Sequence, residues 1–120
     1  MLMRPLYFCI CSTLMLSIAG CGVHEIQERK NVMESLLATN APLNAVESKL
    51  GVHFEIYRRG SAEWTRTLTN YSAHAIPRYQ RIVAKLGKSE ATGHTSTMSM
   101  QTWIFLDKKD RLINYEVSAQ

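Results

Sequence analysis

Residues 96–117 read STMSMQTWIFLDKKDRLINYEV, and this stretch decides the fold class. Its two apolar runs flank Asp107–Asp110, where acidic residues favour a turn. A strand, a turn and a second strand are therefore predicted, with Leu106 opposite Arg111. This register places one apolar set on the first face of the hairpin: Met100, Ile104, Ile113, Tyr115 and Val117. It places a second apolar set on the opposite face: Trp103, Phe105 and Leu112.

A second alternating stretch lies upstream of this hairpin. Apolar and polar residues alternate over residues 52–57, which predicts a half-buried strand. Gly60-Ser61 fits the two-residue loop of a type II′ turn, so a second hairpin is expected. Its register would bring together oppositely charged or aromatic residues: Arg58 with Glu63, Tyr57 with Trp64, and Glu55 with Arg66.

Three helices are predicted around the two hairpins. Residues 24–39 and 76–87 each carry apolar residues at helical spacing. Between them, Asn44 and Glu47 have the spacing of a capping box, which predicts a helix that ends at Gly51. The expected architecture is α+β in the order ααββαββ, with helices packed on an antiparallel sheet.

The connections and the domain count complete this prediction. Lys88–Thr95 is polar and contains a glycine, which predicts a mobile connection. Residues 46–51 and 82–87 share the pattern aliphatic-x-x-Lys-Leu-Gly, which fits either two ordinary helix ends or an internal duplication. Residues 24–120 are expected to form a single domain.

The first 20 residues have the layout of an export signal. Arg4 precedes an uncharged, mainly apolar run over residues 6–18. A transmembrane helix needs roughly 20 apolar residues, and this shorter run ends in small ones. Residues 1–20 are therefore expected to be a cleaved signal peptide.

The residues around the expected cleavage site indicate the type of signal. Ile18-Ala19-Gly20-Cys21 resembles the lipobox of bacterial lipoproteins. The resemblance implies cleavage before Cys21, a diacylglyceryl group on its sulfur and an acylated new amino group, so that residues 21–23 form a lipidated tether. Gly22 stands where inner-membrane lipoproteins of this class often carry Asp, so the outer membrane is the expected location. The alternative is an ordinary secretory signal with an incidental cysteine.

Cysteine content and charge further limit the classes of protein to which the chain could belong. The chain has three cysteines, and Cys9 and Cys11 lie in the expected signal peptide, so only Cys21 would remain and no intrachain disulfide could form. The net charge of +4 is mildly basic and favours at most a weak attraction to anionic lipids. Export argues against a nucleic-acid partner.

The mature chain also resembles one lipoprotein family. A lipobox, a helix ending in Leu50-Gly51 and later tryptophan-bearing strands look like the small accessory lipoprotein of the outer-membrane β-barrel assembly machinery. The resemblance implies two helices against a three-stranded sheet and a role in assembling membrane barrels. That family usually has Gly-x-Ser/Thr where this chain has Asn40-Ala41-Pro42, and no binding residue is carried over.

No motif predicts catalysis, a cofactor or a metal site. The four histidines, His24, His53, His74 and His94, lack the spacing of metal-ligand pairs. Gly-x-Ser-x-Gly and phosphate-binding loops are absent from the sequence, and the only mature cysteine is the expected anchor. The protein is therefore expected not to be an enzyme.

Two sets of side chains are candidates for an interaction surface. One is a basic stripe on the helix over 76–87, which is expected to be solvated or to contact anionic lipid: Arg78, Arg81, Lys85 and Lys88. The other is the apolar cluster of Trp103, Phe105 and Leu112, which is either covered by a helix or exposed as a hot spot for a protein partner.

These observations favour a non-enzymatic envelope lipoprotein that faces the periplasm and binds a protein partner or supports assembly. The alternative is a periplasmic small-ligand-binding protein or an enzyme. A deep pocket lined by His53, Glu55 or His94 would favour this alternative.

Overall fold

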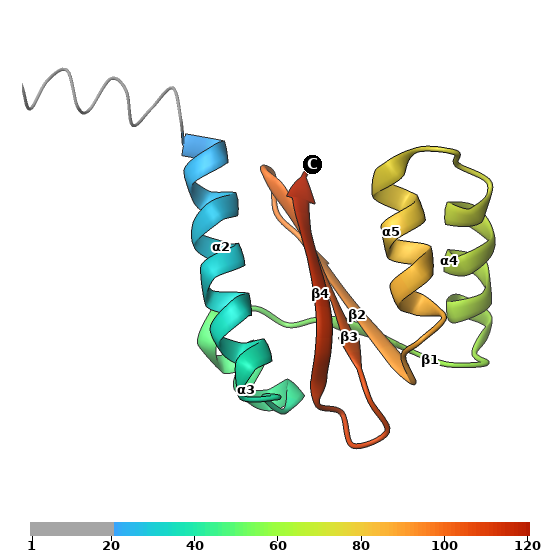
Figure 1. Cartoon of the computed structure of the whole chain (residues 1–120), viewed down its shortest axis with the longest axis horizontal. Coiled ribbons are helices and arrows are strands. Elements are labelled where there is room, and N and C mark those ends of the chain that lie inside the picture. The colour runs from blue at the N-terminus through green and yellow to red at the C-terminus, as the bar shows by residue number, and fades with distance from the viewer. Residues whose placement is uncertain (1–20) are drawn as a thin grey trace, which may run out of the picture.

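A four-stranded antiparallel sheet with helices on both faces forms the protein (Figure 1). The computed structural model describes residues 21–120, so the expected signal peptide lies outside the described residues. The strands are β1 (Glu55–Arg58), β2 (Ala91–Ser96), β3 (Met100–Leu106) and β4 (Leu112–Ala119), in the spatial order β1-β2-β3-β4. The helices are α2 (Cys21–Ala38), α3 (Leu43–Leu50), α4 (Ala62–Ser72) and α5 (Pro77–Leu86). The α+β class is confirmed.

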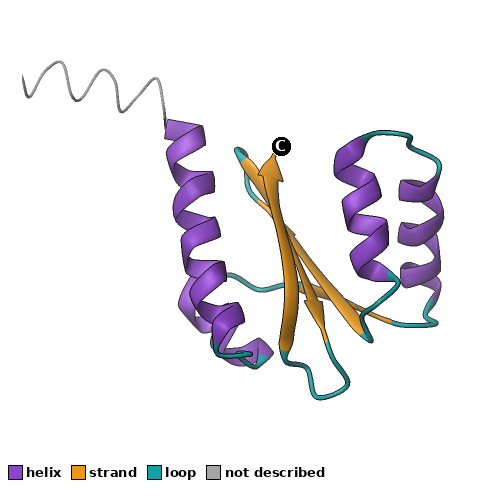
Figure 2. Cartoon of the chain, viewed as in Figure 1, coloured by secondary structure: helices purple, strands orange, loops and turns teal. Residues whose placement is uncertain are grey.

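Helices α2 and α3 cover one face of the sheet, and α4 and α5 cover the other (Figure 2). The larger core lies on the α2/α3 face, where Met33 and Val46 pack against Phe54 and Ile104. The smaller core lies on the α4/α5 face and contains Trp64, Ile82, Leu86, Trp103 and Phe105. Because helices cover both faces of the sheet, β3 is almost entirely buried.

Residues 62–72 form helix α4, and the predicted hairpin at Gly60-Ser61 is wrong. The Ser61 hydroxyl caps the helix by accepting a hydrogen bond from the Trp64 amide at 3.2 Å. Along the helix, the hydroxyls of Thr65, Thr67 and Thr69 donate to carbonyls one turn earlier. These threonines suggest a strand by propensity, but their hydroxyls are satisfied within the helix.

The ion pairs that the hairpin would have formed are therefore absent. Arg58 instead makes a bidentate contact with Asp110 of the β3–β4 turn, at 2.7 and 3.0 Å. Tyr57 and Trp64 belong to the same core between the sheet and helices α4 and α5, but they are not a cross-strand pair.

Residues 91–96 form the inner strand β2, so the expected mobile connection over Lys88–Thr95 is also wrong. The strand pairs with β1 on one side and β3 on the other. A Cβ atom on Gly93 would lie 2.7 Å from Cγ1 of Ile104 and 3.0 Å from Cδ1 of Ile56. The glycine thus marks a crowded strand position rather than a flexible one.

The final hairpin has the predicted strands but a different register. Ile104 pairs with Tyr115 rather than Ile113, and Phe105 pairs with Asn114 rather than Leu112. The irregularity near Phe105 and Leu106 leaves Ile113 outside the pairing and 37% exposed. As a consequence, Leu112 joins the α2/α3 core and does not lie beside Trp103 and Phe105.

The helix boundaries bring two smaller corrections. Helix α2 begins at Cys21, so residues 21–23, expected as a tether before the first helix, belong to that helix. The capping box at Asn44 does not form: Pro42 precedes α3, and the Glu47 carboxylate accepts from the Phe54 amide at 2.9 Å.

The two Leu-Gly sequences end their helices differently. Gly51 is left-handed, with φ of 67°, whereas Gly87 has an α-helical φ of −62°. Helix α5, with Pro77 in its first turn, is confirmed.

Candidate functional site

An open cleft of about 300 Å³ runs along β4 at the edge of the sheet. Its lining comes from three elements: Lys30, Glu34 and Leu37 of α2, Lys85 of α5, and residues 114–117 of β4. Since β4 is an edge strand held between helices on opposite faces, the cleft gathers residues that are distant in sequence. Both signs of charge are present in its wall.

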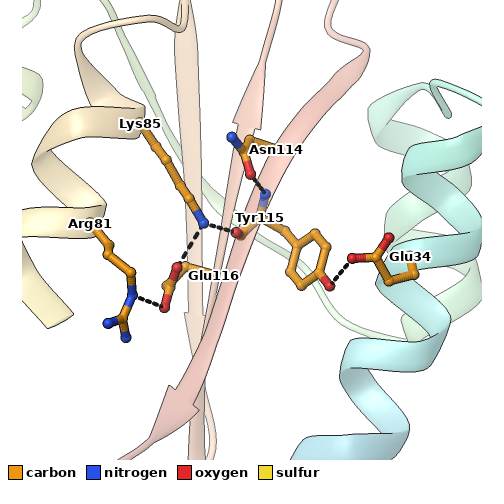
Figure 3. Close-up of polar contacts among 6 residues, drawn as sticks. All are labelled: Glu34, Arg81, Lys85, Asn114, Tyr115 and Glu116. Carbon is orange, nitrogen blue, oxygen red and sulfur yellow. Dashed lines mark hydrogen bonds and ion pairs between the residues drawn. The ribbon is translucent and has the colours of Figure 1, made fainter.

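Glu116 is the polar centre of this region. Its side chain points toward α5, where Arg81 Nε lies 3.1 Å from Oε1 and Lys85 Nζ lies 2.7 Å from Oε2 (Figure 3). Glu116 is buried, with 9% of its surface exposed. A buried carboxylate needs such partners, because an uncompensated charge in the interior is costly. The two cations thus join α5 to β4 at the edge of the sheet.

On the opposite face, Tyr115 joins β4 to α2. Its hydroxyl donates to Glu34 Oε1 at 2.6 Å (Figure 3). Burial, and then the hydrogen bond to the Glu34 carboxylate, raise the pKa of the Tyr115 phenol to about 12. The phenol is therefore neutral and acts as a donor at physiological pH.

Side chains cap most of the outward-facing backbone of β4. Lys85 Nζ donates to the Tyr115 carbonyl at 2.5 Å, and the Tyr115 amide donates to Asn114 Oδ1 at 3.0 Å. Arg78 donates to the Ala119 carbonyl at 3.3 Å. Backbone groups of alternate residues point the same way, so the N–H and C=O of Val117 also point away from β3, but Val117 is only 4% exposed. Such capping limits uncontrolled pairing of an exposed strand.

Three of the four residues of the predicted basic stripe have partners within the fold, although Arg81 is still exposed. Arg81 and Lys85 bind Glu116, and Arg78 lies over the Tyr79 ring, 4.5 Å from its centre. Lys88 follows the helix and is exposed. No local pattern marks Glu116 as the partner of Arg81 and Lys85, because its place opposite α5 depends on the register of β4.

Trp103, Phe105 and Leu112 do not form an exposed surface. Trp103 is 2% exposed and the other two are fully buried. Tyr71 of α4 meets the Trp103 ring edge-on, with ring centres 5.5 Å apart, and Tyr79 of α5 stacks on Tyr71 at 4.6 Å. The alternative in which a helix covers this face is correct for Trp103 and Phe105.

The histidines lie apart and have local partners. Nε2 of His24 lies 3.0 Å from Glu28, and Nδ1 of His53 lies 3.0 Å from Glu47. His94 packs on Trp103, with ring centres 4.4 Å apart, and burial lowers the pKa of its imidazole. Within residues 21–120, no group of three or more His, Cys, Asp or Glu side chains is arranged to hold a metal ion.

A second cavity, of about 360 Å³, lies between α4 and α5. Tyr71, His74 and Val83 are among its lining residues. His53, Glu55 and His94 line neither this cavity nor the β4 cleft.

No family model matches the chain, and neither the curated proteins nor the solved structures give a match. Within the described part of the chain, no helix has the length and apolar character needed to span a bilayer.

Proposed function

We propose that this protein is a non-enzymatic, lipid-anchored component of the bacterial cell envelope that binds a protein partner through the β4 cleft. The lipobox-like sequence before Cys21 supports the anchor. Gly22 supports an outer-membrane location facing the periplasm, and the resemblance to an accessory lipoprotein of barrel assembly supports an assembly role.

One observation carries the binding role: a mixed-charge cleft lies directly beside an edge strand. A partner segment in the cleft would lie along β4 and would be recognised through side chains, because the β4 backbone is capped at positions 115 and 119 and Val117 is only 4% exposed. The charged side chains of such a segment would meet Lys30 and Glu34. An open cleft of this kind suits a polypeptide better than an enclosed small molecule.

Cys21→Ser tests the anchor. We expect the parent protein to start at Cys21, to carry added lipid by intact mass and to sediment with membranes. Two or more acyl chains give stable anchoring, whereas the serine variant has no sulfur to modify and should remain uncleaved and unlipidated. If the serine variant were cleaved normally and still recovered with membranes, lipidation of Cys21 would be refuted. The outer-membrane location is tested separately on a density gradient: recovery of the parent protein wholly with inner membranes would refute it.

Site-specific photo-crosslinking tests the cleft. A photoreactive residue at Leu37 should capture a discrete partner in intact cells, and one at Lys108 in the distant β3–β4 turn should not. Lys30→Glu, combined with the Leu37 probe, should reduce capture about tenfold, because it reverses a charge in the cleft wall. The matched control is Lys108→Glu, which makes the same charge change outside the cleft. Equal capture in both variants would exclude the cleft as the binding site.

A further inference from the structure

Three of the four large apolar side chains that are exposed among the described residues lie at one end of the domain: Val23 is 77% exposed, Ile76 46% and Met98 101%. The fourth, Ile113, lies near the β3–β4 turn and is 37% exposed. Val23 lies in the first turn of α2, Ile76 directly precedes α5, and Met98 lies in the turn between β2 and β3. In Figure 1 these three segments reach the upper end of the molecule, where β4 also ends.

Hydrogen bonds join the segments of this upper end. The Ser99 hydroxyl donates to Glu25 of α2 at 2.7 Å, and the Gln120 amide donates to the Ser99 carbonyl at 3.2 Å. Arg78 of α5 donates to the Ala119 carbonyl at 3.3 Å. The first turns of α2, the β2–β3 turn, the end of β4 and the start of α5 therefore form one continuous surface.

Charge is distributed unevenly between the two ends. The segments 67–77 and 96–100, which contain Ile76 and Met98, include no Lys, Arg, Asp or Glu. Two charged residues beside them, Glu25 and Arg78, have hydrogen-bond partners in Ser99 and the Ala119 carbonyl. The opposite end carries the Asp107–Arg111 turn and the β1–α4 junction, where Arg58 binds Asp110. Arg59 joins that junction to the end of α5 through the Gly87 carbonyl at 2.7 Å. Desolvation against a bilayer is less costly for the upper end than for the charged one.

We propose that the upper end is a membrane-contacting surface, on which Val23, Ile76 and Met98 enter the interface of the bilayer that holds the anchor. The inference rests on the proposed lipidation of Cys21. Helix α2 begins at that residue, at the upper end, so acyl chains attached there would leave from the same surface. Isolated exposed apolar residues are common on soluble proteins. Here three of them lie on the surface that carries the anchor, so the same bilayer can cover all three. This contact holds the upper end of the domain against the bilayer and leaves the β4 cleft open to the side.

Fluorescence in vesicles tests this orientation. Full-length protein isolated from membranes is labelled with an environment-sensitive dye at Met98→Cys or at Ile76→Cys, and reconstituted into phosphatidylcholine–phosphatidylglycerol vesicles. Lys108→Cys in the charged turn is the matched control. Nitroxide-bearing lipids should quench the dye at 98 and 76 at least threefold more than the dye at 108. Unchanged thermal midpoints of the labelled proteins ensure that the fold is intact.

The outcomes separate this proposal from the anchor itself. A lipidated Cys21 is a thioether, so parent protein that takes up no thiol dye and floats with vesicles retains its anchor. If the dyes at 98 and 76 are then quenched no more than the one at 108, the membrane-contacting surface is rejected and the anchor stands. If the parent protein takes up dye at Cys21 and stays in solution, the anchor is rejected, and the orientation with it.

Discussion

Trp103→Ala is expected to destabilise the domain by about 3 to 5 kcal/mol, as the removal of a large buried aromatic side chain usually does. The indole is 2% exposed and lies between the sheet and the aromatic rings of α4 and α5. For a domain of this size the thermal midpoint should fall by roughly 15 °C or more, measured by circular dichroism. The loss is a large part of the 5 to 15 kcal/mol by which domains are typically stable.

A conservative variant separates ring packing from polarity. Trp103 Nε1 is buried and has no hydrogen-bond partner within the described residues. Trp103→Phe removes this unsatisfied donor and keeps an aromatic ring, so it should cost much less than the alanine variant. If Trp103→Ala left the midpoint unchanged and abolished partner capture, the residue would be an exposed hot spot after all.

Gly93→Val is expected to destabilise the domain by about 1 to 3 kcal/mol through overpacking. The added Cβ would lie 2.7 Å from Cγ1 of the fully buried Ile104, and Ile56 blocks the same space at 3.0 Å. Valine favours a strand by its intrinsic propensity, so a loss of stability would come from lack of space around position 93 and not from backbone preference. Urea unfolding gives the difference in free energy directly.

Gly87→Ala is the matched control for this prediction. Its backbone φ is −62°, and the nearest heavy atom to an added Cβ is the Val83 carbonyl oxygen at 3.7 Å. The substitution should be neutral or stabilise the fold by up to about 1 kcal/mol, because it restricts the unfolded chain. If Gly93→Val were equally well tolerated, β2 would not lie against Ile104 as the structure places it.

Local sequence patterns were sufficient to predict those helices and strands whose residues carry a clear period and a clear end. Helical apolar spacing with Pro77 in the first turn predicts α5, and the apolar runs around Asp107–Asp110 predict β3 and β4. These elements establish the α+β class, because each pattern reflects the period of a single helix or strand. The lipobox-like sequence at Cys21 is likewise a local feature, and the expected lipidation remains a prediction.

Tertiary contacts decided the elements whose local signals are ambiguous. Residues 62–72 combine strand-favouring threonines with Trp64, Leu68 and Tyr71 at helical spacing. Packing of these three side chains against the sheet favours the helix. Residues 91–96 resemble a polar loop in isolation. Their backbone becomes the inner strand because it pairs on both sides, and Gly93 fits where a larger residue would collide.

The candidate site shows the same division most clearly. The sequence alone determines that α5 carries Arg81 and Lys85 one turn apart, but not what they bind. Their partner Glu116 depends on the β3–β4 register, which shifts because Ile113 is left out of the pairing. Side chains alternate between the faces of a strand, so this local irregularity decides which residues of β4 face α5 and which face α2. The alternation of apolar and polar residues along one strand does not show where such an irregularity lies. Its position is determined by the packing of both helical layers against the sheet.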